Sequence, residues 1–192
     1  MIVQTAPSNA TNRIDEADPV WLMNQYRSAE VHGAGAIMRM GRLAESSELQ
    51  ASLSRHLRDE AVHAWLWTRA IEEFGGEIVD VDEPYQSRLA AHFGIPRNLV
   101  DMLALTWASE RRGLAQYSKH LDQGDVPSPI KRTLRGIIKD EKWHVDYIRE
   151  ELERRALSNP AVQRSMDRAL EADLAAVNEL RDLSATVNAA GR

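Results

Sequence analysis

One short motif, Asp-Glu-x-x-His, occurs twice in the sequence, and each copy is preceded by a separate Glu-x-x-Gly motif. The first motif occupies residues 59–63 and 140–144, and the second occupies residues 30–33 and 110–113. The copies are 81 residues apart for the first motif and 80 residues apart for the second. Two motifs that repeat at nearly the same separation indicate that one structural unit occurs twice in the chain.

Glycine and proline residues divide the chain into long stretches that carry apolar residues at helical spacing. Ser47 and Gln50 form a capping-box signature, which predicts that a helix begins at Ser47. The segment 77–84 is expected to be a connection, and strand signals are nearly absent, so the sequence predicts an all-α protein. The predicted helices run from Pro19 to about Ala44, Ser47 to Phe74, Tyr85 to Phe93, Pro96 to about Gln123, Ser128 to about Leu157 and Pro160 to about Thr186.

The order of these helices predicts an antiparallel four-helix bundle, in which two helical hairpins are joined by the short crossover helix 85–93. Residues 19–157 are expected to form this bundle, residues 1–18 a flexible N-terminal arm, and residues 158–192 an additional C-terminal helix and tail. The C-terminal helix carries an apolar stripe, which either packs on the bundle or forms the contact of a homodimer. The stripe consists of Val162, Met166, Leu170, Leu174, Val177 and Leu180.

The spacing of the repeated residues predicts that they meet at one level of the bundle. Glu30 lies about 16 residues before the turn near residues 45–47, and the midpoint of Glu60 and His63 lies about 16 residues after it. At a rise of about 1.5 Å per residue, both positions lie roughly 24 Å from the turn. The second repeat is arranged in the same way about a turn near residue 126.

Four carboxylates and two imidazoles at one level require cations, because four buried negative charges without counter-ions are too costly. Two divalent metal ions would neutralise them, and this mixture of ligands suits iron or manganese, with zinc as an alternative. One Glu-x-x-His motif is common on solvent-exposed helices, whereas two copies in register, each with a glutamate on the paired helix, favour a metal site. The predicted ligands are Glu30, Glu60, His63, Glu110, Glu141 and His144.

Three further residues of the same helices carry groups that could support these ligands. Asp59 and Asp140 are placed to accept the outer ring N–H of a histidine ligand, on the same or on the facing helix. His56, one turn before Glu60, is either a seventh ligand or proton donor, or a histidine outside the ligand set.

Small and aromatic residues also lie near the predicted ligands. Gly33 and Gly113 either open a space, together with Ala34, for dioxygen or a substrate, or allow close packing of helices. Tyr26 and Tyr117 share the ligand-bearing faces of their helices. They are either redox-active or hydrogen-bonded to a metal-bound oxygen, or they are packed core residues.

Composition excludes several classes of function. The 192 residues suffice for one domain with a sizeable core. A net charge of -5 leaves no basic excess for nucleic acid or for an anionic membrane surface. Cysteine is absent, which excludes thiolate ligands and fits a reducing compartment. No apolar stretch approaches the roughly 20 residues of a membrane span, so a cytoplasmic location is expected.

On these motifs the chain resembles the ferritin-like di-iron-carboxylate superfamily, in which two helices each supply a Glu and two others each supply Glu-x-x-His. The resemblance covers roughly residues 19–157 and extends the superfamily's ligand roles to the six predicted ligands. Storage ferritins generally carry one Glu-x-x-His motif, so two copies favour the oxygen-activating branch of rubrerythrins and small di-iron oxygenases. The chain lacks the cysteine-rich segment that rubrerythrin-type peroxidases usually carry.

The resemblance implies a non-haem di-iron oxidoreductase that activates dioxygen or peroxide to oxidise a small organic substrate. Two iron ions are the expected cofactor, and a manganese–iron pair or two manganese ions are alternatives. A separate electron donor is expected, because none is fused to the chain. The alternative functions are ferroxidase activity or other iron handling, and a metal-stabilised structural module without turnover.

Overall fold

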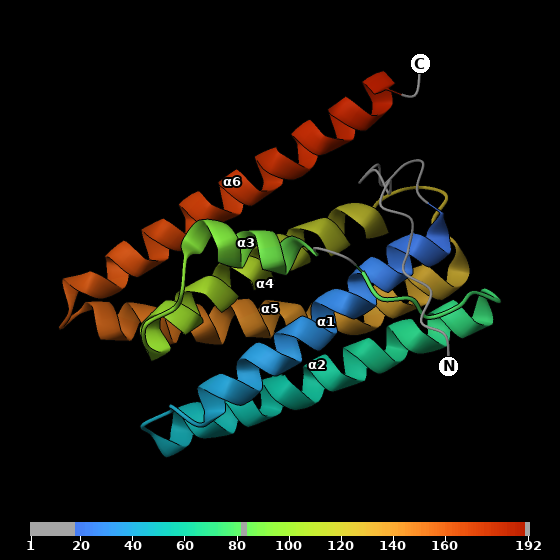
Figure 1. Cartoon of the computed structure of the whole chain (residues 1–192). Helices are drawn as coiled ribbons and strands as arrows, with labels where there is room; N and C mark the ends of the chain where they lie inside the picture. Colours follow the sequence, from blue (N-terminus) through green and yellow to red (C-terminus); the bar gives the residue numbers. More distant parts are fainter. Residues whose placement is uncertain (1–17, 82–83, 191–192) are drawn as a thin grey trace.

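Residues 18–81 and 84–190 are described by a computed structural model of the chain, with side chains described up to residue 181. Six helices and no strand occur in these residues, which confirms the predicted all-α fold. The predicted N-terminal arm lies outside the described residues, apart from Asp18. The helices are α1 (Pro19–Gly41), α2 (Ser47–Glu73), α3 (Tyr85–Phe93), α4 (Leu99–Leu121), α5 (Ser128–Ala156) and α6 (Pro160–Ala190) (Figure 1).

The cap of α2 lies one residue before the predicted capping box. Ser46 is the N-cap residue: its backbone is extended, and its hydroxyl accepts a hydrogen bond from the backbone N–H of Leu49 at 3.2 Å. Gln50 donates its side-chain amide to the carbonyl of Ala44 at 3.0 Å. The predicted box at Ser47 was wrong, because two adjacent serines offer the same side chain and only the extended one can cap the helix.

Helix α4 begins three residues after the predicted start at Pro96. The side chain of Asn98 accepts a hydrogen bond from the backbone N–H of Asp101 at 2.9 Å. The carboxylate of Asp101 in turn accepts from the backbone N–H of Arg97 at 3.1 Å. These two bonds satisfy backbone N–H donors at and just before the start of the helix, so the boundary lies at Asn98 rather than at the proline.

The connection from α2 to α4 is shaped by two glycines and one buried asparagine. As predicted, glycine ends both α2 and α3: Gly75 has a φ of 72° and Gly94 a φ of 83°, a conformation that favours glycine. The side chain of Asn24 on α1 donates to the carbonyl of Glu77 and accepts from the N–H of Val79, each at 3.0 Å. The start of the connection is thereby held against α1.

Four long helices contact one another in a closed ring. Helix α1 packs on α2, α2 on α5, α5 on α4, and α4 on α1. The short loops 42–46 and 122–127 join α1 to α2 and α4 to α5, so each pair runs antiparallel (Figure 1). Helix α3 follows α2 in the chain and packs on α1, α4 and α6.

Each helix of the ring passes from one apolar cluster to another along its length. One cluster includes Trp67 of α2 and Tyr117 of α4. The other includes Leu53 of α2 and Leu103 of α4. Between the clusters, all four helices place buried acidic or histidine residues. The ring therefore encloses a polar layer in the middle of an otherwise apolar core.

Helix α6 packs on α3, α4 and α5, which agrees with one of the two interpretations of its apolar stripe. Leu174, a member of the predicted stripe, is 57% exposed, so the packed face differs from the predicted one. Alanines make up much of the packed face. Among the α6 residues up to 181, the buried ones are Val162, Met166, Ala169, Ala172 and Ala176.

A part-buried ion pair fixes α6 to α3 and α4. Asp173 of α6 accepts two hydrogen bonds from the Arg112 guanidinium of α4, at 2.9 and 2.6 Å. It also accepts one from the Tyr85 hydroxyl of α3 at 2.6 Å. A bidentate arginine–carboxylate pair constrains orientation as well as distance, so it sets how α6 is rotated against the ring.

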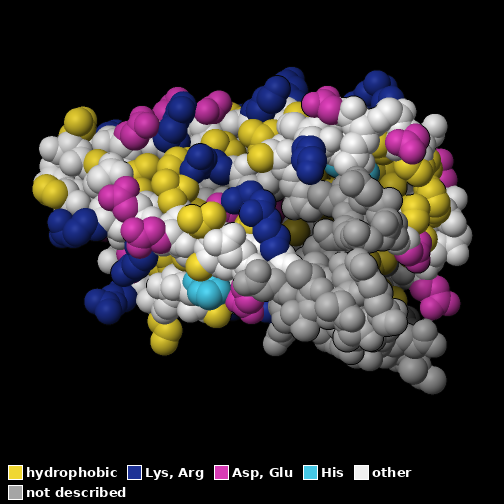
Figure 2. Space-filling model, turned by 90° about the horizontal axis from the view of Figure 1, so that it is seen from above, with side chains coloured by type: hydrophobic (Ala, Val, Ile, Leu, Met, Phe, Trp, Pro, Cys, Tyr) yellow, Lys and Arg dark blue, Asp and Glu magenta, His cyan; other side chains and the backbone are white. Residues whose placement is uncertain are grey.

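The surface offers two further observations. Within residues 18–81 and 84–190, no helix combines the length and the apolar character that crossing a membrane requires. On the face shown in Figure 2, Lys and Arg side chains are interspersed with Asp and Glu side chains, and hydrophobic side chains lie between them. Charges of both signs are therefore mixed among the described residues of this face.

Candidate metal centre

The six predicted ligands lie together in the polar layer between the two apolar clusters. None of them is more than 9% exposed. Because the ring brings α2 against α5 and α1 against α4, both copies of the repeat reach this layer. Helix α1 contributes Glu30, α2 contributes Glu60 and His63, α4 contributes Glu110, and α5 contributes Glu141 and His144.

Their ligand atoms form two overlapping groups. One group is His56, Glu60, Glu110 and His144, and the other is Glu30, Glu60, His63 and Glu141. In each group, one nitrogen or oxygen atom per residue lies within 4.8 Å of those of the other residues. Glu60 belongs to both groups, so its carboxylate lies between two candidate metal positions.

Glu141 also faces both groups, through different oxygen atoms. Its Oε1 lies 3.0 Å from Nδ1 of His63, and its Oε2 lies 3.5 Å from Nδ1 of His144. A carboxylate whose two oxygens face two different imidazoles is placed to bridge two metal ions.

The carboxylate of Glu60 occupies the space left by a glycine on α1. A Cβ atom added at Gly33 would lie 2.0 Å from Oε2 of Glu60. The carboxylate of Glu60, a predicted ligand, therefore fills the space that one of the two interpretations of Gly33 assigned to dioxygen or a substrate. A Cβ added at Gly113 would meet no atom within 4 Å, so the two glycines of the repeat are not equivalent.

Each predicted histidine ligand has its second ring nitrogen near an aspartate of the facing helix. Nε2 of His63 on α2 lies 3.6 Å from Oδ2 of Asp140 on α5. Nε2 of His144 on α5 lies 3.5 Å from Oδ2 of Asp59 on α2. With Nε2 near an aspartate, Nδ1 of each ring is directed at the glutamates. A carboxylate beside the outer nitrogen is the arrangement that orients a metal-binding imidazole.

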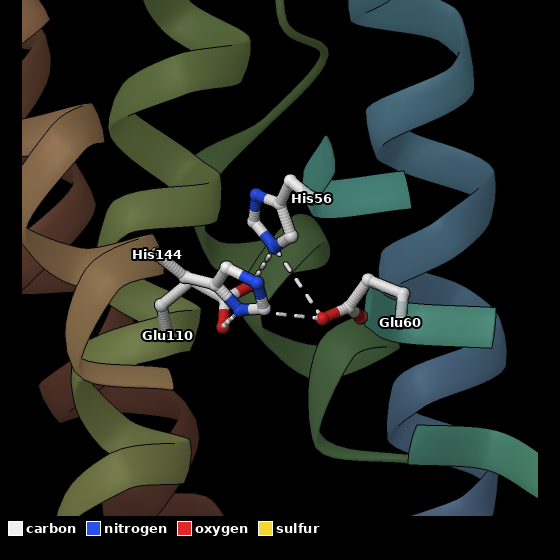
Figure 3. Close-up of side chains that lie close together, drawn as sticks. All are labelled: His56, Glu60, Glu110 and His144. Carbon is white, nitrogen blue, oxygen red and sulfur yellow. Dashed lines mark ion pairs between the residues drawn. The ribbon is translucent and has the colours of Figure 1, made fainter. Parts of the chain in front are cut away.

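His56 is fully buried in the same layer, with its Nε2 directed at two glutamates (Figure 3). Nε2 lies 3.3 Å from Oε1 of Glu60 and 3.5 Å from Oε1 of Glu110. Its Nδ1 lies 2.9 Å from the hydroxyl of Tyr147. His56 thus lies within the cluster of ligand residues rather than beside it.

The two tyrosines predicted to share the ligand faces have different partners. The hydroxyl of Tyr117 donates to Oε1 of Glu30 at 2.5 Å. Burial raises the pKa of Tyr117 well above its usual range, and the charge of Glu30 raises it further, so the hydroxyl keeps its proton. The hydroxyl of Tyr26 pairs instead with Nδ1 of His120 at 3.1 Å. Only Tyr117 contacts a predicted ligand directly.

Replacing Tyr117 with phenylalanine is expected to weaken metal binding about 10-fold, because Glu30 loses the donor that orients its carboxylate. Calorimetric titration of the metal-free protein with Mn²⁺ measures the change. Tyr26→Phe is the matched control, since it removes a buried hydroxyl of the same aromatic cluster that does not touch a glutamate. Equal affinities for the two variants would contradict a role for Tyr117 at Glu30.

Without metal, the cluster retains protons. Burial raises the pKa of Glu60 well above its usual range, and the charges of the three other glutamates raise it further. Burial lowers the pKa of His63, but contacts with Glu141 and Glu30 outweigh burial and raise it to about 11. Metal binding must displace such protons, because only the deprotonated groups are ligands.

The strongest sign that the cluster fits metal ions is a set of buried polar atoms without hydrogen-bond partners. Such atoms are rare in folded proteins, and each one requires an explanation. Most of those in the described part of the chain belong to this layer. They are Nε2 of His56, Oδ2 of Asp59, Oε1 of Glu60, both ring nitrogens of His63, Oε1 of Glu141 and both ring nitrogens of His144.

Sequence reasoning did not identify Tyr147 as a partner of the site. It lies three residues after His144, but its hydroxyl contacts His56, which is 91 residues away in the chain. No local spacing predicts a contact between those two positions. The spacing also did not decide whether His56 belongs to the ligand set, because helical spacing determines only the face of the helix on which a side chain lies.

No protein-family model matches the chain, and neither does any curated protein or solved structure. What supports a functional assignment is therefore the type of the buried residues and their arrangement.

Proposed function

We propose that this protein is a di-iron oxidoreductase of the ferritin-like type, in which α1, α2, α4 and α5 form an antiparallel four-helix bundle and α3 is the crossover. The bundle holds two metal ions in its polar layer and uses them to oxidise a small organic substrate with dioxygen or peroxide. A manganese–iron pair or two manganese ions are the alternative contents of the site.

The observation that carries this proposal is the set of buried nitrogen and oxygen atoms without hydrogen-bond partners, gathered in two groups that share Glu60. An apolar core does not retain four carboxylates and three imidazoles unless cations compensate them. Two divalent ions would supply the compensating charge and would also bind the unpaired atoms that face the glutamates, which are Nε2 of His56, Oε1 of Glu60, Oε1 of Glu141 and Nδ1 of His63 and His144.

The contacts suggest how the ligands divide between the two ions. Glu60 and Glu141 would be shared by the two ions, because each faces both groups. Glu30 and His63 would hold one ion, and Glu110 and His144 would hold the other. Carboxylate oxygens with imidazole nitrogens suit iron and manganese, which is the basis for expecting these metals.

When bound, a pair of redox-active ions supplies electrons to dioxygen and serves as a Lewis acid. The chain's own residues keep the site dry and in place. The two apolar clusters exclude water from the ends of the layer, and Asp59 and Asp140 lie beside the outer nitrogens of the two histidine rings, where they would orient them. Tyr117 retains a proton beside Glu30. We expect a separate electron donor to complete the system.

Metal analysis and rapid mixing test this proposal. The protein is depleted of metal, loaded with ferrous iron without oxygen, and mixed with oxygenated buffer under optical detection. We expect about two irons per chain and a transient visible absorption. An absence of bound metal, together with a stability that is indifferent to ferrous and manganous ions, would contradict the proposal.

The same experiment separates the alternatives. An iron-handling protein would release oxidised iron from the centre into a large hollow assembly, which size-exclusion chromatography detects. A structural module would bind metal and be stabilised by it, but oxygen would produce no optical change. An oxidoreductase retains its two ions after the reaction and returns to its starting spectrum when a reductant is added.

A further inference from the structure

His56 has no equivalent in the second half of the chain, although the surrounding motif is repeated. The residue 81 positions later is Ile137, which is fully buried in the apolar cluster around Trp67 and Tyr117. Tyr147, the partner of His56, corresponds in the first half to Leu66, which packs against that same cluster. The repeat therefore supplies a histidine and a tyrosine to one side of the polar layer and aliphatic residues to the other.

His56 is oriented like the two predicted histidine ligands, and its outer nitrogen has a closer partner than theirs. In each ring, one nitrogen is directed at the glutamates and the other lies near an oxygen of a neighbouring helix. For His56 that oxygen is the hydroxyl of Tyr147, 2.9 Å from Nδ1. A ring that donates Nδ1–H to an oxygen presents a free electron pair at Nε2, as a metal ligand requires.

The orientation of Tyr147 is fixed by its own neighbours. Trp143 stacks on its ring with centroids 4.6 Å apart, and the guanidinium of Arg55 covers Trp143 at 3.7 Å. Tyr147 can therefore hold the His56 ring in one orientation.

Nε2 of His56 is buried and has no hydrogen-bond partner, although it faces two carboxylates. The ring also stacks on that of His144, with centroids 3.6 Å apart and planes 20° apart (Figure 3). The two stacked rings direct Nε2 of His56 and Nδ1 of His144 into one group of ligand atoms.

We infer that His56 binds the same ion as Glu110 and His144, so that the two metal positions of the centre are chemically different. This inference rests on the proposed metal centre. One position has two imidazoles, and the position at Glu30 and His63 has one. Because imidazole favours iron over manganese and carboxylate favours manganese, the position with two imidazoles should bind its ion more tightly and select iron, cobalt or zinc.

Titration of the metal-free full chain with Co²⁺, followed by calorimetry and by visible absorption, tests the inference. The unaltered protein should bind two ions in two steps that differ at least about 10-fold in affinity. His56→Gln should weaken the tighter step about 100-fold, change the visible spectrum of the first cobalt ion and leave the other step unchanged. Tyr147→Phe should weaken the tighter step about 10-fold, because it removes only the partner that positions the ring.

His120→Gln is the matched control, because His120 is a buried histidine paired with Tyr26 rather than with a glutamate. It should leave both steps and the spectrum unchanged. Circular dichroism shows whether each variant is folded. If His56→Gln does not fold, the affinity of Tyr147→Phe for the first cobalt ion tests the inference instead. Two equal steps in the unaltered protein, or an unchanged first cobalt spectrum in folded His56→Gln, would overturn the inference while the di-metal centre stands. No cobalt binding by the unaltered protein would instead overturn the centre itself.

Discussion

Replacing Glu60 with glutamine is expected to stabilise the metal-free protein and, at the same time, to weaken the binding of both metal ions at least about 100-fold. Glutamine keeps the shape of the side chain but removes a buried carboxyl group whose ionisation is opposed by burial and by three other carboxylates. It also removes the one carboxylate that belongs to both groups of ligand atoms. The two effects have opposite signs, which distinguishes a ligand from a structural residue.

The gain in stability follows from the direction of the pKa shift. Burial and the neighbouring glutamates raise the pKa of Glu60, so the folded state binds its proton more tightly than the unfolded state does. This carboxyl therefore contributes less stability as the pH rises above its ordinary pKa of 4.5. At neutral pH we expect Glu60→Gln to gain about 1–3 kcal/mol. For a domain of this size, each kcal/mol raises Tm by roughly 2–4 °C.

Thermal unfolding in the presence of a chelator measures the first effect, and titration with Mn²⁺ measures the second. Glu150→Gln, at an exposed position of α5, is the control and should change neither quantity appreciably. A metal-free Glu60→Gln protein that is less stable than the parent would mean that the carboxylate is a structural hydrogen-bonding group. Retention of two tightly bound ions would show that Glu60 is not a shared ligand.

The second large effect is expected from adding one methyl group at Gly33. The new Cβ would lie 2.0 Å from Oε2 of Glu60, so the end of this side chain must move. Because that end is flexible, the fold should persist while the carboxylate leaves its place between the two metal positions. We expect Gly33→Ala to weaken metal binding about 10–100-fold, the range for residues that position a ligand.

Gly113→Ala is the control that the repeat itself provides. Both glycines lie inside helices, where alanine is favoured by about 1 kcal/mol, and a Cβ at Gly113 meets no atom within 4 Å. Gly113→Ala should therefore raise Tm by roughly 2–4 °C and leave metal affinity unchanged. Calorimetric titration of the two variants in parallel isolates the effect of the contact with Glu60. Unchanged affinity in Gly33→Ala would contradict the bridging position of that carboxylate.

Much of the fold could be predicted from local features of the chain. Helical spacing and glycine stops predicted the elements, because a helix has the same period wherever it lies. The ends were less accurate where another residue caps the helix, as at α4, which begins after the Asn98 cap rather than at Pro96. The packed face of α6 was also predicted only in part, since Leu174 is exposed while Ala172 and Ala176 are buried.

Much of the candidate site could be predicted for a related reason. Glu and His three residues apart lie on one face of a helix, and a short loop sets the height of a residue relative to its partner on the next helix. The residues of both repeats could thus be placed at one level before any tertiary contact was known. What this reasoning lacks is the rotation of each helix and its distance from helices that are not its neighbours in sequence.

The sequence by itself determined six helices with two copies of an acidic and histidine-bearing unit, because these depend on helix period and loop length alone. The tertiary structure decided that Asp59 and Asp140 serve histidines of the facing helix, and that Gly33 makes room for Glu60. It also decided that His56 faces the centre. Each of these outcomes depends on how α1, α2 and α5 are rotated and spaced against one another, which only the packing of side chains from distant parts of the chain can set.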